Sequence, residues 1–397
     1  MNNFDFDKVI DRRGTASAKW DTLPQTGAGE PAYIALSTAD MDFAVPPVIS
    51  DALEKVVARR IYGYTTEGAD PRFRDSLRWW LKRRFDLDVS AEEIVVGDGS
   101  IGMMNCIVEG FSNVADGIIL QRPVYGTFTR AFQDQCHRRI ASARLIRHDN
   151  FEYSMDFAAL EAACATPRNK IFVLCSPHNP VGRVWSQDEL EQVLDICRRH
   201  RVLIISDEIH CDLVRPGQKH IPLLSLARPD DLVIQIGSIS KSFNCAGINS
   251  ACALVRNPRL REQLRAVLPS TLISPFALEA QVAAYSEAGE EWLDELNAYY
   301  DETIRQVRAL FAEKMPEVQI TDPQGTYLLW FDFNPTGLSD AEIHHLVHDV
   351  ARVRLTDGLM HDPDGGSGFQ RMTTSSPRSI VLEACERIIT AFREYLK

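Results

Sequence analysis

The chain has 397 residues, of which 45% are hydrophobic and 25% are charged, and its formal net charge is −12. This length exceeds what one hydrophobic core usually serves, so we expect two domains or one large α/β unit. The acidic balance argues against a nucleic acid or an anionic membrane as a partner, because both select a basic surface.

The nine cysteines are scattered along the chain and form no CxxC pair. An odd, unpatterned set is typical of a reducing compartment rather than of a disulfide framework or a zinc site. Residues 1–14 contain no apolar signal-peptide core, and nowhere do 18 apolar residues follow one another. These features predict a cytoplasmic protein with no metal centre and no membrane span.

The first half of the chain alternates strand and helix patterns. Residues 1–45 mix aromatic, charged and turn residues, which is typical of an arm rather than a packed layer. Short apolar runs then predict strands, with helix-compatible segments between them, at 93–97, 117–121, 170–175, 201–206 and 232–236. Strands this apolar, separated by helices, predict an α/β fold with a mostly parallel sheet covered on both faces.

After about residue 275 the pattern changes to long helices. Residues 277–288 and 291–315 carry helical periodicity, and short strand candidates follow at 327–331 and 353–355. We therefore predict a smaller α+β domain at the C-terminus. The predicted division is an N-terminal arm over 1–45 that joins the small domain, a large domain over 46–285 and a small domain over 286–397.

Three polar residues, Asn179, Asp207 and Lys241, each fall just past the end of a predicted strand. In parallel sheets, ligands bind at the carboxyl ends of the strands. Burial there would lower the pKa of a lysine and supply the neutral amine that Schiff-base chemistry needs. Each residue alone also has a simpler interpretation: a turn former for Asn179, a helix N-cap for Asp207 and a solvated loop lysine for Lys241.

A competing motif lies at 97–102, where Gly97, Gly99 and Gly102 satisfy the GxGxxG pattern of dinucleotide-binding folds, with Asp116 further on. This pattern would suggest an oxidoreductase. Asp116 is better interpreted as part of a turn before the next strand, and the dinucleotide hypothesis leaves the strand-end residues without a role. What remains is a helix start whose backbone N–H groups can hold a phosphate.

The segments 176–182, 206–210 and 238–241, in their order and spacing, resemble the pyridoxal 5′-phosphate site of the class I/II aminotransferase superfamily, which has fold type I. The resemblance covers nearly the whole chain. Five further segments resemble the cystathionine β-lyase (C–S lyase) branch, at 11–21, 39–43, 62–64, 179–185 and 207–212.

The resemblance implies a role for each matching residue. Lys241 would bind the cofactor aldehyde covalently and later move the Cα proton, and Asp207 would pair with the pyridinium nitrogen. Asn179 would bond the phenolic oxygen of the cofactor, and Tyr125 would stack on its ring; both would also touch the substrate. His210 would lie near the same oxygen or serve only the structure.

The phosphate would be held by the backbone at 99–101 (Gly99, Ser100 and Ile101), by the Ser238 hydroxyl and by Tyr64 of a partner subunit, which implies a homodimer with shared active sites. Many superfamily members have an arginine eight residues after the lysine, where this chain has Asn249.

Arg371 matches the arginine that binds the carboxylate of an amino-acid substrate, a role that suits its forked guanidinium. Thr373 replaces the asparagine usual two residues later, and Arg378 is a rival candidate for the same role.

The branch resemblance predicts a C–S β-lyase that cleaves cysteine-derived thioethers, such as cystathionine, to a thiol, pyruvate and ammonia. An aminotransferase that passes the amino group to a 2-oxo acid is the alternative. A regulator that binds the cofactor is a third hypothesis, although the complete set of candidate site residues argues for catalysis.

Overall fold

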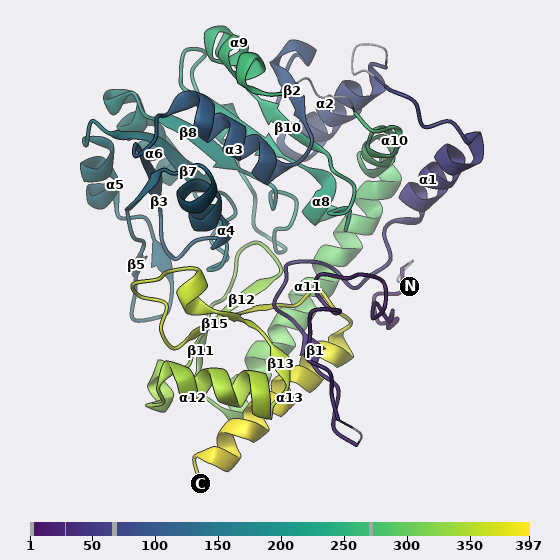
Figure 1. The fold of residues 1–397 in the computed structure, drawn as a ribbon, viewed down its shortest axis with the longest axis vertical. Coiled ribbons are helices and arrows are strands. Elements are labelled where there is room, and N and C mark those ends of the chain that lie inside the picture. Colours follow the sequence, from purple (N-terminus) through teal and green to yellow (C-terminus); the bar gives the residue numbers. More distant parts are fainter. Residues whose placement is uncertain (1–3, 28, 66–69, 270–272) are drawn as a thin grey trace.

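The computed structural model describes residues 4–27, 29–65, 70–269 and 273–397. Its largest sheet has the strand order β2 (Ile94–Gly97), β10 (Ala251–Leu254), β9 (Val233–Gly237), β8 (Leu203–Asp207), β7 (Asn169–Cys175), β3 (Gly117–Leu120) and β4 (Arg139–Ser142). The neighbours from β9 to β4 are parallel, whereas β10 runs antiparallel to both β2 and β9. The predicted α/β class with a mostly parallel sheet is confirmed (Figure 1).

Alternate side chains of these strands enter two separate hydrophobic cores. Ile171 and Val173 pack with α3 (Ser100–Phe111) and α9 (Pro258–Val267), whereas Phe172 and Leu174 pack on the opposite face. The helices in the core of that opposite face include α2 (Arg72–Phe85), α5 (Phe157–Cys164), α6 (Gln187–His200) and α10 (Pro275–Ala284). Burial on both faces explains why the strands are apolar throughout.

Shorter elements complete this part of the chain. They are the helices α1 (Pro47–Arg59), α4 (Thr127–Thr129), α7 (Leu223–Leu226) and α8 (Ile239–Ser242), the hairpin of β5 (Ile146–Arg147) and β6 (Tyr153–Ser154), and the π-helical turn Arg130–Gln135.

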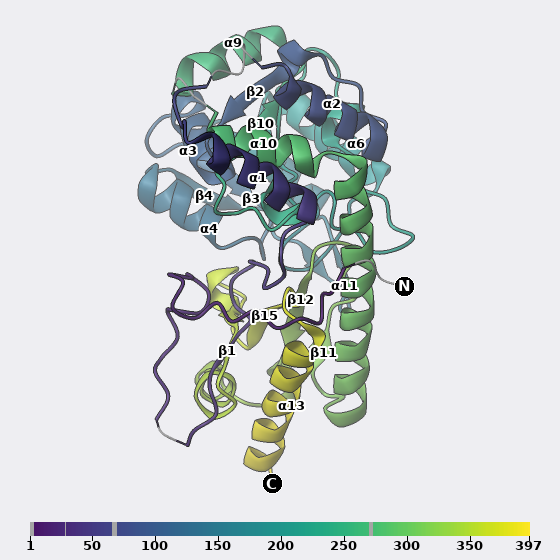
Figure 2. The same cartoon turned by 90° about the vertical axis from the view of Figure 1, so that its right-hand side faces the viewer.

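A second sheet, antiparallel throughout, has the order β11 (Gln319–Ile320), β12 (Leu328–Asp332), β15 (Phe369–Thr373) and β14 (Thr356–Asp357). The long helix α11 (Glu287–Lys314) runs from the first sheet's half of the molecule along the second, where α13 (Arg378–Tyr395) lies beside it (Figure 2). Helix α12 (Asp340–His344) continues into a π-helical turn, His345–Val350.

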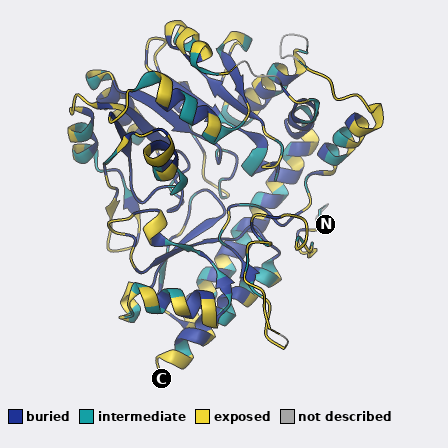
Figure 3. Cartoon of the chain, in the orientation of Figure 1, coloured by how far each residue is buried: buried dark blue, intermediate teal, exposed yellow. Residues whose placement is uncertain are grey.

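The N-terminal segment reaches the second sheet's half of the molecule. Strand β1 (Ile34–Ala35) pairs in parallel with β13 (Val353–Arg354), and the buried positions concentrate around both sheets (Figure 3). The division of the chain at residues 45 and 285 stays a prediction. Among the described residues, no helix combines the length and apolar character that crossing a membrane requires.

The topology also bears on the GxGxxG motif. Among the described strands, β2, which precedes the motif, pairs only with the antiparallel β10, and four other strands lie between β2 and β3 in the sheet. A dinucleotide-binding unit needs those two strands to be parallel neighbours in one βαβ motif; here they run in the same direction but are not neighbours. The Asp116 carboxylate instead accepts a hydrogen bond from the Asn113 backbone at 2.8 Å, which makes it a turn residue, as the sequence indicated.

Candidate active site

Lys241 lies in α8, the short helix that follows strand β9. The sequence places it there because Ser238, at the end of the strand, caps the helix by accepting a hydrogen bond from the Ser240 backbone at 3.1 Å. The Lys241 side chain is half-buried, and its amine donates to the carbonyl oxygen of Ala39 at 2.6 Å. Burial lowers the pKa of Lys241, while Asp40 and Asp207 oppose this effect. A buried lysine with a lowered pKa is suited to act as a nucleophile and a base.

Asp207 ends the neighbouring strand β8 and is buried. One of its carboxylate oxygens accepts a hydrogen bond from the Ile209 backbone at 3.3 Å. Burial raises the pKa of Asp207 to about 7, because this one bond and the nearby Lys241 amine compensate only partly for lost solvation. A buried carboxylate whose lost solvation is only partly compensated is stabilised by any cation placed against it, such as a protonated ring nitrogen.

Asn179 and Arg371 meet although 192 residues separate them in the chain. Arg371, in the middle of β15, donates to the Asn179 side-chain oxygen at 3.3 Å and to the Ser37 carbonyl oxygen at 2.6 Å. Because the oxygen of Asn179 accepts from the guanidinium, its amide nitrogen remains as a donor for a ligand. The buried Nε of Arg371 has no hydrogen-bond partner among the residues that the structure describes.

Two cavities meet at Lys241 and Tyr125, which line both of them. The first cavity, of about 520 Å³, contains the predicted phosphate residues Gly99, Ser100, Ile101 and Ser238, together with Asn249. The second, of about 490 Å³, contains Arg371 and residues of β13 and β14. We call them the phosphate-side cavity and the carboxylate-side cavity.

The phosphate-side cavity is built from a helix start and hydroxyl groups. Gly99 precedes α3 with a φ of 154°, in the region that favours glycine, and the first residues of this 12-residue helix, whose N–H groups have no partner within the helix, line the cavity. Among the described residues that line it, Lys241 is the only cation, and Asp98 adds a negative charge.

The structure does not bring every predicted residue to the cavities. Asp207, Asn179 and His210 are buried beside them and line neither. His210 packs edge-on against Tyr327 with ring centroids 5.7 Å apart, and burial lowers the pKa of His210 to about 3. Tyr64 is 93% exposed and lies outside both cavities, so a contact with a cofactor would need a second subunit.

Arg378, the rival of Arg371, lies elsewhere. Its guanidinium lies over the ring of Tyr299 at 4.3 Å and donates to the Thr303 hydroxyl at 3.1 Å. Thr373, which replaces the usual asparagine, shares a hydrogen bond of 2.6 Å with the Ser375 hydroxyl rather than with Arg371.

Sequence reasoning missed the contribution of the N-terminal segment to the site. The Ala39 carbonyl oxygen accepts hydrogen bonds from Lys241 and from the Tyr327 hydroxyl, the latter at 3.2 Å. Asp40 forms an ion pair with Arg12 at 2.7 Å and acts on the charge of Lys241. The motif at 39–43 marks this segment in the sequence, but nothing local indicates what it contacts.

These residues fit a cofactor with an aldehyde, a basic ring nitrogen and a phosphate. The cavity next to Lys241, the buried carboxylate of Asp207 and the free N–H groups before α3 provide one partner for each of these groups. The fold and site are therefore those of an enzyme that uses pyridoxal 5′-phosphate.

Residues 31–388 match the family described as aminotransferase class I and II, and the chain belongs to this family. It is 34% identical to the cystathionine beta-lyase PatB of Bacillus subtilis over 97% of this chain and 99% of PatB. It is also similar to the pyridoxal-phosphate-containing structure of cystalysin from Treponema denticola, at 32% identity over 99% of both chains and a TM-score of 0.91. A pyridoxal-phosphate-bound putative aminotransferase from Clostridium difficile 630 has 33% identity over 98% of this chain and 100% of its own, with a TM-score of 0.91.

Proposed function

We propose that the protein is a pyridoxal-phosphate-dependent C–S β-lyase that cleaves cysteine-derived thioethers to a thiol, pyruvate and ammonia. The observation that carries this proposal is the half-buried Lys241, whose charge is influenced by both the Asp207 carboxylate and the Arg371 guanidinium, in a chain similar over its whole length to PatB and cystalysin.

Each site residue has a task in the reaction. When bound, the cofactor withdraws electrons from the substrate Cα. Arg371 binds the α-carboxylate through a charge-assisted contact and so fixes the orientation of the Cα–H bond. The Lys241 amine, once it has lost its own proton, accepts the Cα proton, a step that general bases accelerate by about 10²–10⁴-fold. The Cβ–S bond then breaks, and the sulfur leaves with the electron pair and takes up a proton. The remaining three-carbon unit reacts with water to give pyruvate and ammonia.

An aminotransferase is the second candidate, because the similar Clostridium difficile structure is described as one. In both reactions Lys241 removes the Cα proton. The two reactions differ in the next step. In transamination Lys241 would pass the proton on, whereas in β-elimination the β-substituent leaves.

Product analysis separates the two reactions. The purified protein is incubated with L-cystathionine alone and, separately, with an amino acid and 2-oxoglutarate. Pyruvate and thiol formed without an oxo acid support the lyase, whereas glutamate formed only with the acceptor supports the aminotransferase. Lys241→Ala should lose both activities and the visible absorption of the bound aldehyde. The exposed Lys170 provides the matched control, since Lys170→Ala removes a lysine far from this chemistry.

We also propose that the protein works in the cytoplasm as a homodimer. All nine cysteines are free thiols, which suits a reducing compartment. The exposed Tyr64 is free to enter the phosphate-side cavity of a partner subunit.

A further inference from the structure

Arg354 lies on the wall of the carboxylate-side cavity without an acidic partner. It is the last residue of β13, and it lines the cavity together with the three residues that follow it, Leu355, Thr356 and Asp357. Val353, the residue before it, enters the hydrophobic core instead. Among the described residues, no carboxylate lies within ion-pair distance of Arg354; its side chain donates to the His348 Nδ1 atom at 2.9 Å.

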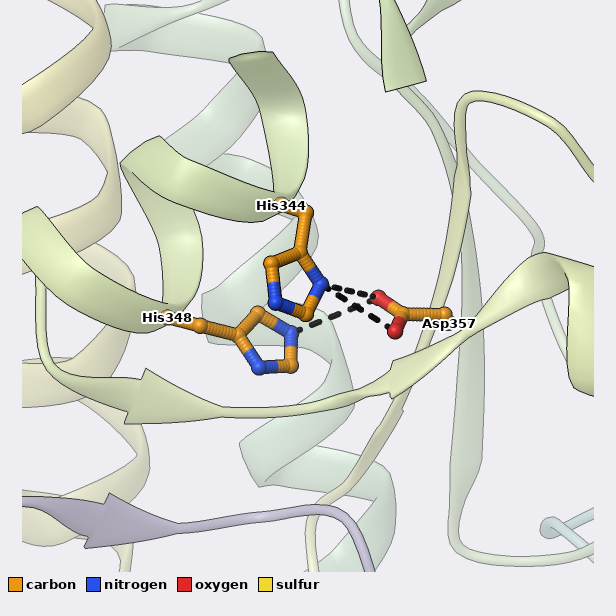
Figure 4. Close-up of side chains that lie close together, drawn as sticks. All are labelled: His344, His348 and Asp357. Atoms are coloured by element: carbon orange, nitrogen blue, oxygen red, sulfur yellow. Dashed lines mark hydrogen bonds and ion pairs between the residues drawn. The ribbon is translucent and has the colours of Figure 1, made fainter. Parts of the chain in front are cut away.

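A hydrogen-bond chain holds the guanidinium in place. His344, His348 and Asp357 lie together beside β14 (Figure 4). Burial lowers the pKa of His348 to about 4, so its ring is neutral, and because an arginine only donates, Nδ1 is the acceptor. The hydrogen of that ring therefore sits on Nε2, 3.5 Å from oxygens of Gln370 and Asp357.

Asp357 is already engaged by other groups. The Gln370 amide donates to its carboxylate at 2.8 Å, and His344 Nδ1 lies 3.1 Å from both carboxylate oxygens. The group is thus a connected network that orients Arg354 and leaves its charge without a counter-ion.

The charges in this cavity are unusual for an acidic protein. Lys241, Arg354 and Arg371 line it, and Asp357 is the one carboxylate among its lining residues in the described chain. A cavity with positive walls concentrates anionic ligands, even when the whole chain has a net charge of −12.

The two arginines are spaced for one extended ligand. Arg371 donates to the Thr356 hydroxyl at 3.2 Å, and Thr356 is its partner in the register of β14 and β15. Arg354 lies two residues before Thr356 on the same side, about 7 Å away along the extended segment. A thioether with a carboxylate at each end spans such a distance.

We propose that Arg354 binds a second carboxylate, at the far end of the thioether, so that the enzyme selects substrates whose leaving half carries a carboxylate. This specificity rests on the proposed lyase function for its substrate class, but the binding site can be tested without the reaction. L-Cystathionine, with a carboxylate on its leaving half, belongs to the selected class, whereas S-methyl-L-cysteine does not.

The binding test uses two amino acids of equal length that contain no sulfur. L-2-Aminoadipate ends in a carboxylate and L-norleucine in a methyl group. We expect the cofactor-loaded enzyme to bind aminoadipate at least tenfold more tightly, as measured by calorimetry, since loss of a charge-assisted contact costs about 10- to 100-fold. Arg354→Gln should remove most of this preference, and Arg354→Lys should keep part of it because the charge remains.

Arg352 provides the matched control. It is also an arginine beside β13, but it pairs with Glu30 at 2.8 Å and lines neither cavity, so Arg352→Gln should keep the full preference. In turnover, Arg354→Gln should lower the ratio of kcat/KM for cystathionine to that for S-methyl-L-cysteine at least tenfold.

The outcomes separate the two proposals. If neither thioether yields pyruvate but the aminoadipate preference depends on Arg354, the lyase proposal fails and the anion site stands. If the wild type binds both amino acids equally, or Arg354→Gln leaves the preference within twofold of the wild type, the anion site is refuted. Arg354→Met replaces the glutamine variant if the latter does not retain the cofactor.

Discussion

Replacing Asp207 by asparagine should change the stability of the cofactor-free protein and its cofactor affinity in opposite directions. The two side chains have the same shape, and the asparagine oxygen can still accept the hydrogen bond from Ile209. Only the charge is lost. In the folded protein, burial raises the pKa of Asp207 to about 7, well above the 3.8 of an aspartate in solvent.

Proton linkage gives the sign and the size of the difference in unfolding free energy between the two cofactor-free proteins. Because the folded pKa is raised, the contribution of Asp207 to stability is fully present below pH 4 and is lost as the pH rises to about 7. A difference of about 3 pKa units corresponds to about 4 kcal/mol above pH 8. The asparagine variant does not ionise, so without the cofactor it should be more stable than the wild type by up to about 4 kcal/mol at pH 8.5, and nearly equal to it at pH 4.

Thermal unfolding of both cofactor-free proteins measures this difference. For a chain of this length, 4 kcal/mol corresponds to an increase in Tm of about 5 °C at pH 8.5. The cofactor affinity of the variant should fall, since the ring nitrogen loses its anionic partner. A Tm difference that is independent of pH would refute the burial argument, and an unchanged cofactor affinity would refute the assigned role.

Four further substitutions test other parts of the structure. Lys19→Met should destabilise the protein by about 1.5–3 kcal/mol in urea unfolding, because the buried Asp42 carboxylate loses its contact with Lys19 at 2.7 Å and keeps its ion pair with Arg12 at 3.0 Å; a loss under 1 kcal/mol would contradict this. Asn249→Arg should tighten cofactor binding at least tenfold in equilibrium dialysis, because it adds a cation to the phosphate-side cavity, and an unchanged affinity would show that the phosphate lies elsewhere. Arg371→Lys should lower kcat/KM about 10- to 100-fold by removing the forked contact with the α-carboxylate, and a change under twofold would remove Arg371 from that role. Tyr64→Phe should weaken cofactor binding severalfold, and mixing this variant with Lys241→Ala should restore activity only if the two subunits share their sites; mixtures no more active than the parents would contradict sharing.

The parts of the fold that the sequence predicted are those with a local physical cause. The apolar runs ending before Asn179, Asp207 and Lys241 became β7, β8 and β9, three neighbours in one sheet. The capping box at Ser186 starts α6 as its pattern indicated. The antiparallel pairing of β10 with β2 and β9 could not be predicted, because a short buried strand has the same apolar pattern whether its neighbours are parallel or antiparallel.

The contacts that the sequence did not predict are those that depend on distant segments. Nothing near Lys241 indicates that Ala39 accepts its hydrogen bond. His348 lies only six residues before Arg354, but β13 is two residues long, and its pattern is too short to indicate that the two side chains meet. Only the folded chain distinguishes Arg371, which lines a cavity, from Arg378, which lies over an aromatic ring.

The arrangement of the two cavities separates the residues that would bind the cofactor from those that would determine which substrate is accepted. The phosphate-side residues come from the first sheet's half of the molecule, where helix starts and strand ends fix the positions of backbone groups. Most of the carboxylate-side residues come from the N-terminal segment and from the chain around β13, β14 and β15, whose short strands and side-chain hydrogen bonds can vary without disturbing the first sheet. Lys241 and Tyr125 are common to both cavities, so the reacting carbon must lie where they meet. Changes in substrate preference should therefore arise from the carboxylate side, and changes in cofactor affinity from the phosphate side.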